Sequence, residues 1–197
     1  PAQTAKMNKT LRRSKPSAAR TVEAAVKRAD IVLETAVGEV VGPVVRAAAA
    51  GGKDVVILSI GGLMADSSLI TLAEKSGISL YLPSGAIAGV DGILAAATGK
   101  ITALTLTTSK PPSGLKGTNA DKKKATRRTT LFEGSPREAY KKFPRNINVA
   151  ATLFMASRYP HIKVKVVLDP AIQRNVHRVE LESDICRMLV ELENIPS

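Results

Sequence analysis

Hydrophobic and polar positions follow two different patterns along the chain, and the change falls near residue 83. Before it, short apolar runs rich in Val and Ile alternate with segments of helical spacing. The predicted elements are a helix within 18–29, strands over 31–36, 54–59 and 79–82, and helices over 40–50 and 66–75. Because these strands lack polar alternation, we expect a parallel sheet with helices on both faces.

After residue 83, apolar and polar positions alternate within the strands, which is typical of a sheet with one buried face. The predicted elements are helices over 90–98, 136–142 and 147–158, strands over 101–108, 129–133 and 162–168, a loop over 109–126, and a closing hairpin over 176–182 and 187–193. The pattern therefore predicts an α/β fold followed by an α+β domain with a mixed sheet.

The composition is that of an ordinary globular protein. The 197 residues are 44% hydrophobic and 23% charged, and no apolar run approaches the roughly 20 residues that a membrane helix needs. The single cysteine, Cys186, cannot form an internal disulfide. These features argue against disordered and transmembrane classes, predict no membrane partner, and make the cytoplasm the simplest location.

An excess of positive charge raises the question of a polyanionic partner. The chain has 29 Lys and Arg residues against 17 Asp and Glu residues, which gives a net charge of +12. Aromatic residues amount to only 3%, and the sequence carries no recognised nucleic-acid motif. We interpret the basic clusters at 6–28 and 116–128 as solvated surface, and we do not expect a nucleic-acid partner.

Candidate chemistry is concentrated at the predicted strand ends and around one histidine. Small or polar residues at 34–36, 59–62 and 83–86 follow parallel strands, at the edge where such sheets bind ligands. These residues either allow a nucleotide to approach the backbone or form ordinary turns. A G-x-G-x-x-G loop would decide between the two, and the sequence has none. From the residues alone, His177 is an acid–base or a structural group, and Asn148 caps a helix or contacts a ligand. The sequence shows no metal-ligand spacing.

Ordered motifs follow one another along the chain. They are IVLETA at 31–36, GKDV at 52–55, LPSGAIAG at 82–89, SKPP at 109–112, LFEGS at 131–135, FPRNINVA at 143–150, DPA at 169–171 and NVH at 175–177. In this order the motifs resemble the L-aspartate dehydrogenase family over nearly all of residues 29–197. The resemblance implies a partial Rossmann-type dinucleotide-binding domain in residues 1–86 and a catalytic and dimerisation α+β domain in residues 87–197.

The resemblance also implies an activity and three site residues. Members of the family oxidise L-aspartate to iminoaspartate with NAD or NADP, feed NAD biosynthesis and form homodimers. Ala86 and Asn148 match the family's cofactor-contacting Ala and Asn, and His177 matches its active-site His. An imidazole beside the substrate amine can exchange a proton while the cofactor accepts electrons from the α-carbon.

Departures from the family pattern leave a second interpretation open. The family's Gly-rich turn and ribose-selecting residue have no counterpart here, and the resemblance is still continuing at Ser197. We therefore expect a chain truncated at both ends, with exposed apolar surface. The alternative function is a non-catalytic remnant that oligomerises or binds polyanions. Basic residues at 6–13 are compatible with NADP, and those at 117–128 could attract the dicarboxylate substrate if they are not simply a solvated loop.

Overall fold

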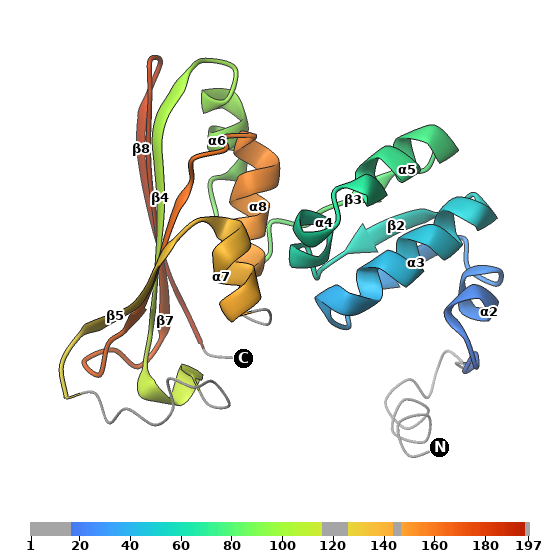
Figure 1. The fold of residues 1–197 in the computed structure, drawn as a ribbon, viewed down its shortest axis with the longest axis horizontal. Helices are drawn as coiled ribbons and strands as arrows, with labels where there is room; N and C mark the ends of the chain where they lie inside the picture. Colours follow the sequence, from blue (N-terminus) through green and yellow to red (C-terminus); the bar gives the residue numbers. More distant parts are fainter. Residues whose placement is uncertain (1–16, 116–125, 144–146, 196–197) are drawn as a thin grey trace.

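Two sheets organise the molecule, which is described by a computed structural model over residues 17–115, 126–143 and 147–195. One sheet has three parallel strands in the order β1-β2-β3, and the other has five strands in the order β5-β6-β4-β7-β8. Figure 1 shows helices α6, α7 and α8 between the two sheets. The predicted succession of a parallel α/β sheet and a mixed α+β sheet is confirmed.

The three-stranded sheet is built from the first half of the chain. Its elements are α2 (Val22–Val26), β1 (Ile31–Glu34), α3 (Gly38–Gly51), β2 (Asp54–Ile57), α4 (Gly61–Ala65), α5 (Ser68–Ser76) and β3 (Leu80–Tyr81). Helix α3 ends where Gly52 adopts a left-handed conformation with φ of 62°, which glycine tolerates without steric cost. The 18–29 helix is shorter than predicted, because only residues 22–26 are helical.

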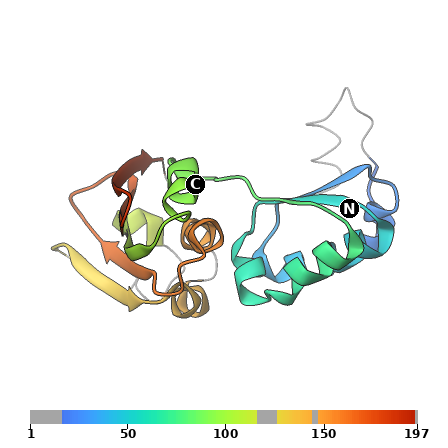
Figure 2. The ribbon, with the colours of Figure 1, turned by 90° about the horizontal axis from the view of Figure 1, so that it is seen from above.

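Helices cover one face of the three-stranded sheet within the described residues, so the prediction of helices on both faces is wrong there. Val32 of β1 is paired with Val55 of β2. Val55 belongs to the core cluster that includes residues of α3 and α5, and the half-buried Val32 packs against it. Figure 2 shows these helices along one side of the strands. On the opposite face Ile31 and Leu33 are 53% and 62% exposed. The expected exposed apolar surface is therefore present.

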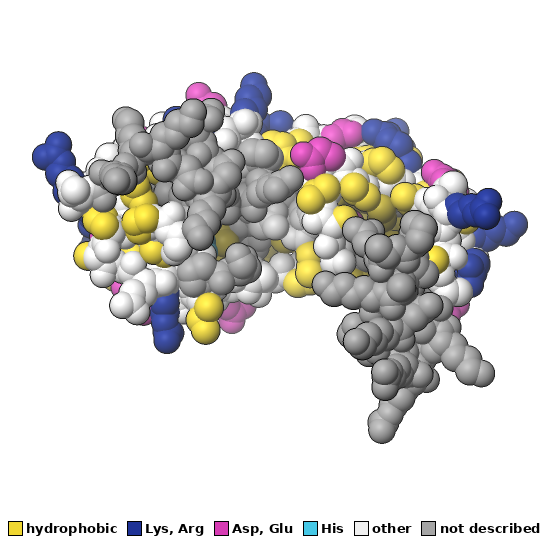
Figure 3. Space-filling view, turned by 90° about the horizontal axis from the view of Figure 1, so that it is seen from below, with side chains coloured by type: hydrophobic (Ala, Val, Ile, Leu, Met, Phe, Trp, Pro, Cys, Tyr) yellow, Lys and Arg dark blue, Asp and Glu magenta, His cyan; other side chains and the backbone are white. Residues whose placement is uncertain are grey.

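This surface lies on the half of the molecule that holds the three-stranded sheet. Figure 3 shows apolar side chains gathered over that half. The large apolar side chains exposed there are Ile31, Leu33, Val37, Leu58 and Tyr81. Exposed apolar side chains that gather on one part of a surface favour contact with another apolar surface.

The turn after β2 differs from the prediction of a single helix over 66–75. A short helix, α4, forms first, and α5 begins at Ser68 because the Asp66 carboxylate accepts hydrogen bonds from the Ser68 backbone N–H and hydroxyl. The backbone of α4 packs closely against α3, since a Cβ on Gly62 would lie 2.5 Å from the Gly38 carbonyl oxygen. The small residues of this turn therefore bring two helices together.

The five-stranded sheet is built from the second half. Its elements are α6 (Val90–Ala96), β4 (Ile101–Lys110), η1 (Pro112–Leu115), β5 (Thr129–Gly134), α7 (Pro136–Lys142), α8 (Asn148–Ser157), β6 (Lys163–Leu168), β7 (Asn175–Ser183) and β8 (Arg187–Asn194). Strand β4 is central, parallel to β6 and antiparallel to β7, while β7 and β8 form the predicted hairpin. Helix α7 has the predicted bounds and begins with a capping box between Ser135 and Glu138.

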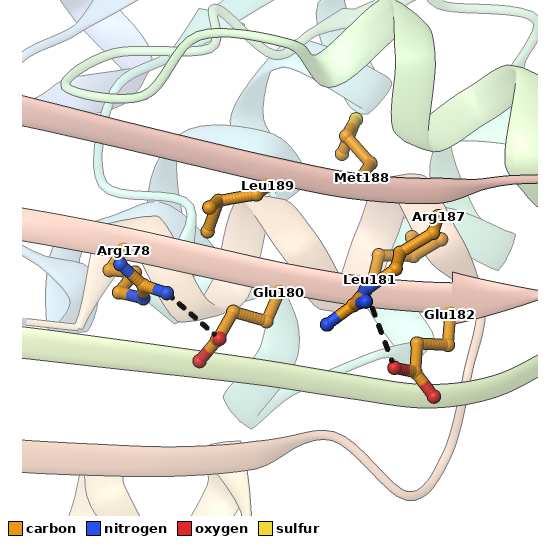
Figure 4. Close-up of a pocket in the computed structure, with 7 residues that line it drawn as sticks. All are labelled: Arg178, Glu180, Leu181, Glu182, Arg187, Met188 and Leu189. Atoms are coloured by element: carbon orange, nitrogen blue, oxygen red, sulfur yellow. Dashed lines mark hydrogen bonds and ion pairs between the residues drawn. The ribbon is translucent and has the colours of Figure 1, made fainter.

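The outer face of this sheet carries charged side chains. A depression of about 420 Å³ lies at β7 and β8. Among the residues that line it, Arg178 lies 3.2 Å from Glu180 and Arg187 lies 3.6 Å from Glu182 (Figure 4). Exposed ion pairs of this kind contribute little to stability. The depression lacks His177, Ala86 and Asn148, so the candidate chemistry lies elsewhere.

Three earlier observations fall partly or wholly outside the described residues. These are the basic residues at 6–13, most of the basic segment at 117–128, and residues 144–146 of the motif at 143–150. Over the part of the chain that the structure covers, none of the helices has both the length and the apolar character needed to cross a membrane.

Candidate functional site

The carboxyl edge of the three-stranded sheet is organised by one buried carboxylate. Glu34, at the end of β1, is 3% exposed. Its oxygens accept hydrogen bonds from the Ala36 backbone N–H at 2.6 Å, the Ser59 backbone N–H at 2.9 Å and the Ser59 hydroxyl at 3.0 Å. These bonds tie the ends of β1 and β2 together, which fixes the edge where parallel sheets bind ligands.

The loop that follows β3 leaves this edge and reaches the second sheet. Residues 83–86 are exposed, and Gly85 has a φ of 65° with open space around its α-carbon. The Ala86 carbonyl accepts a hydrogen bond of 3.1 Å from Nδ2 of Asn194 on β8. The loop therefore presents small residues and backbone groups between the two sheets.

A second contact between the halves involves Asn148, the first residue of α8. Its Oδ1 accepts a hydrogen bond of 3.4 Å from the Gly61 backbone N–H at the start of α4. Tyr140 and Ile147 also approach Gly61, since a Cβ there would lie 2.9 Å and 3.4 Å from their side-chain atoms. The exposed side chain of Asn148 thus lies at the junction of α4 and α8, and it does not cap its own helix.

The helix-covered face of the five-stranded sheet changes from apolar to polar along its length. Leu104 is paired with Leu181 and Leu106 with Val179, and all four are at most 2% exposed. The next pair on this face is Thr108 with His177. Continuing the register by two residues places Lys110 opposite Asn175, which in turn is paired with Asn194 of β8. The polar residues on this part of the face are Thr108, Lys110, Asn175, His177 and Asn194, and we call them the polar end of the sheet.

His177 is the buried histidine of this polar end. It is 7% exposed, and its Nδ1 lies 3.1 Å from the Thr108 hydroxyl oxygen. Burial, and to a smaller extent the positive charge of Lys110, lowers the pKa of His177 to about 4. The imidazole is therefore neutral near pH 7, and when Nδ1–H donates to Thr108 the lone pair on Nε2 can accept a proton.

Lys110 and Asn175 complete the polar end. Lys110 is 6% exposed, and burial lowers the pKa of its ammonium group. The backbone oxygen of Lys110 accepts a hydrogen bond from the Asp169 N–H, which anchors the end of β4. Oδ1 of Asn175 is buried and has no hydrogen-bond partner among the described residues. A buried cation, a neutral imidazole and a buried acceptor therefore share one region.

The structure brings together some of the predicted site residues. Ala86 and His177 belong to the same region, because Asn194 bonds to Ala86 and pairs with Asn175 beside His177. Asn148 lies at the separate contact with Gly61. The second histidine, His161, is exposed and stacks edge-on against Tyr159, so it takes no part in this region. The cofactor and catalytic roles of Ala86, Asn148 and His177 stay predictions.

Three polar residues of the polar end were not predicted from the sequence, whereas Glu34 belongs to the predicted strand end 34–36. The three are Thr108, Lys110 and Asn194. The signal was present in the alternation of β4 and β7, which continues past the apolar positions with polar residues at the same spacing. Among the described residues there is no group of three or more His, Cys, Asp or Glu side chains that could hold a metal ion.

Comparison with protein families gives two matches that together span most of the chain. Residues 91–197 match the family model described as aspartate dehydrogenase, C-terminal. Residues 3–83 match the model described as homoserine dehydrogenase, NAD binding domain. The two matches meet at the loop that carries Ala86.

Individual relatives agree with these matches. The chain is 39% identical to an L-aspartate dehydrogenase of Methanosarcina barkeri, over 95% of this chain and 72% of the relative. It is 40% identical to an L-aspartate dehydrogenase of Bradyrhizobium diazoefficiens, over 86% of this chain and 63% of the relative. The crystal structure of aspartate dehydrogenase from Thermotoga maritima superposes with a TM-score of 0.74 at 30% identity, covering 85% of this chain and 69% of that chain.

Proposed function

This chain belongs to the aspartate dehydrogenase family, and on that premise we propose that it oxidises L-aspartate to iminoaspartate with NAD or NADP. The observation that carries the proposal is the polar end of the five-stranded sheet. There a buried imidazole that is neutral near pH 7 lies beside a buried ammonium group, next to the loop that leaves the dinucleotide-binding edge. This arrangement suits an anionic substrate that must lose a proton.

The residues between the two sheets fit the cofactor. The exposed loop 83–86 carries no bulky side chain over its backbone, and Gly85 is surrounded by open space, so a flat ring can approach closely. Ala86 and Asn148 are the residues that we propose contact it. Bound NAD or NADP supplies the acceptor for the two electrons that leave the substrate α-carbon.

The protein's own groups handle the proton and the position of the substrate. We assign to Nε2 of His177 the proton lost from the substrate amine, with Thr108 holding the imidazole through Nδ1. The buried surroundings exclude water and keep the imidazole in its basic, neutral form. Glu34 acts at a distance by fixing the strand ends from which the cofactor-binding loops emerge.

Several finer statements belong to the same proposal. We place the boundary between the dinucleotide-binding part and the catalytic part at residues 86 and 87, supported by family matches that end at 83 and begin at 91. We also propose a homodimer, action in the cytoplasm and a role in NAD biosynthesis, each supported by the family to which the chain belongs. Sedimentation of the purified chain tests the dimer directly.

The activity is tested by following NAD(P)H formation from L-aspartate at alkaline pH. The purified chain is compared with His177→Ala and with His161→Ala, which alters an exposed histidine outside the site. We expect activity in the wild type and in His161→Ala, and a loss of at least roughly 100-fold in His177→Ala. A folded wild-type chain that reduces neither NAD nor NADP with L-aspartate would contradict the proposal and favour the non-catalytic alternative.

A further inference from the structure

Two further residues of the polar end, Lys110 and Asn175, bring a buried side chain and a buried amide oxygen to this face and take no proton in the reaction assigned to His177. Lys110 is the last residue of β4 and Asn175 is the first residue of β7. The last pair between these strands is Ser109 with Val176, so Lys110 and Asn175 come directly after it, each two residues from the pair of Thr108 and His177. Apolar residues fill the preceding positions of the same face. A sheet stabilised only by packing would continue with apolar residues here, because burying polar groups is costly.

Lys110 has the charge and the position to recognise an anion. Its side chain extends from the covered face of the sheet, and the residue is 6% exposed. Lys110 lies on the same face as His177, two residues along β4 from Thr108, the residue that is paired with His177. The positive charge of Lys110 contributes to the lowered pKa of His177. A carboxylate bound by Lys110 would therefore lie beside His177.

Asn175 supplies the complementary polarity. An amide oxygen accepts hydrogen bonds and cannot donate them, so Oδ1 suits an ammonium group. This oxygen is buried without a hydrogen-bond partner in the described parts of the chain, which is costly unless a ligand supplies the donor. The neighbouring Asn194 is held by its bond to Ala86. Asn175 therefore offers the buried acceptor next to the loop between the sheets.

We propose that Lys110 and Asn175 recognise the two charged ends of the amino-acid substrate. Nζ of Lys110 binds a carboxylate, and Oδ1 of Asn175 accepts a hydrogen bond from the α-ammonium group, so that the amine lies next to His177. The inference rests on the proposed function, because it names the residues that select an amino dicarboxylate at the same site. It predicts that the two residues respond differently to ligands that lack the amine.

Succinate, a dicarboxylate without an amine, separates the two roles. Its dissociation constant is measured by calorimetry in the presence of NADH, and the KM for L-aspartate is measured on the same proteins. In Lys110→Met we expect both constants to rise by roughly 30-fold or more, because a charge pair is lost. In Asn175→Leu we expect the KM for L-aspartate to rise roughly 10-fold while succinate binding changes by less than about 2-fold.

Matched controls distinguish recognition from folding. Lys165→Met removes a lysine that pairs with Glu133 at 3.6 Å on the neighbouring strand and should leave both constants unchanged. Lys110→Gln keeps a polar side chain and should weaken succinate binding as Lys110→Met does. NADH affinity, followed by fluorescence, should stay within about 2-fold in every variant.

The outcomes separate this inference from the proposed function. The inference is wrong, even where the enzyme is active, if Lys110→Met and Lys110→Gln bind succinate with the wild-type dissociation constant. It is also wrong if Asn175→Leu raises the dissociation constant of succinate as much as it raises the KM for L-aspartate. If the wild type binds succinate through Lys110 but does not oxidise L-aspartate, recognition of the dicarboxylate stands and the proposed reaction fails.

Discussion

The buried histidine makes a quantitative prediction about stability and pH. Burial and the charge of Lys110 hold the pKa of His177 at about 4 in the folded chain, against 6.5 for an ordinary histidine. Because the folded-state value is the lower one, the unfolded chain binds more protons between these two values. Stability is therefore retained above about pH 6.5 and is lost as the pH falls toward 4.

The size of the loss follows from the same two pKa values. At about pH 5 the unfolded histidine is mostly protonated and the folded one mostly neutral, so moving from about pH 7 to about pH 5 lowers the free energy of unfolding by about 2 kcal/mol through this residue alone. His177→Gln removes the titrating group and should reduce the loss by that amount. His161→Gln, which changes an exposed histidine outside the site, is the matched control variant.

Urea unfolding at several pH values between about 5 and 7.5 measures this slope for the three proteins. Carboxylates also contribute to the pH dependence, and the difference between wild type and His177→Gln cancels their contribution. An identical slope in wild type and His177→Gln would refute the reasoning, as would an NMR titration that places the pKa of His177 near 6.5.

Three further predictions address the strand edge and the junction between the halves. Gly62→Ala should lower the free energy of unfolding by about 2 kcal/mol, because a Cβ would lie 2.5 Å from the Gly38 carbonyl oxygen. Gly42 faces open space on α3, so Gly42→Ala should raise the free energy of unfolding by up to about 1 kcal/mol. Urea unfolding tests both variants. Glu34→Ala should cost about 3 kcal/mol by the same assay, since it leaves the Ser59 and Ala36 donors without their acceptor, and the exposed Glu74→Ala should change stability by less than about 0.5 kcal/mol. Asn148→Ala should weaken NADH binding roughly 10-fold in a fluorescence titration, and an unchanged affinity would remove Asn148 from the cofactor site.

Local sequence signals predicted the elements whose ends are fixed by local interactions. Helix α7 begins at a Ser-x-x-Glu capping box and has the expected bounds, and α3 ends at a glycine with positive φ. The alternation within β4 and β7 likewise predicted strands with one buried face. In each of these cases the residues that determine the structure are close in sequence.

The features that the sequence did not predict depend on contacts between residues far apart in the chain. Ser109 and Lys110 precede two prolines and were expected in a loop, yet β4 continues through them because β6 pairs with both and β7 pairs with Ser109. The apolar runs of β1 and β2 indicated a preference for burial, but they carry no information on which element covers each face. Lys110 was not predicted because its place in β4 depends on pairing with β6. The uncovered face was not predicted because apolar runs do not show which element covers each face.

The same two strands, β4 and β7, carry both the stability and the chemistry of the second half. Toward one end their covered face consists of leucine and valine that are almost fully buried, and this part can offset the cost of burying Lys110 and His177 at the other. The polar end also makes one of the contacts with the first half, through the hydrogen bond from Asn194 to the Ala86 carbonyl. A cofactor held at the edge of one sheet and a substrate held at the polar end of the other would therefore meet at this contact. The polar residues of these strands thus lie at the end that contacts the first half, where the proposed reaction needs them.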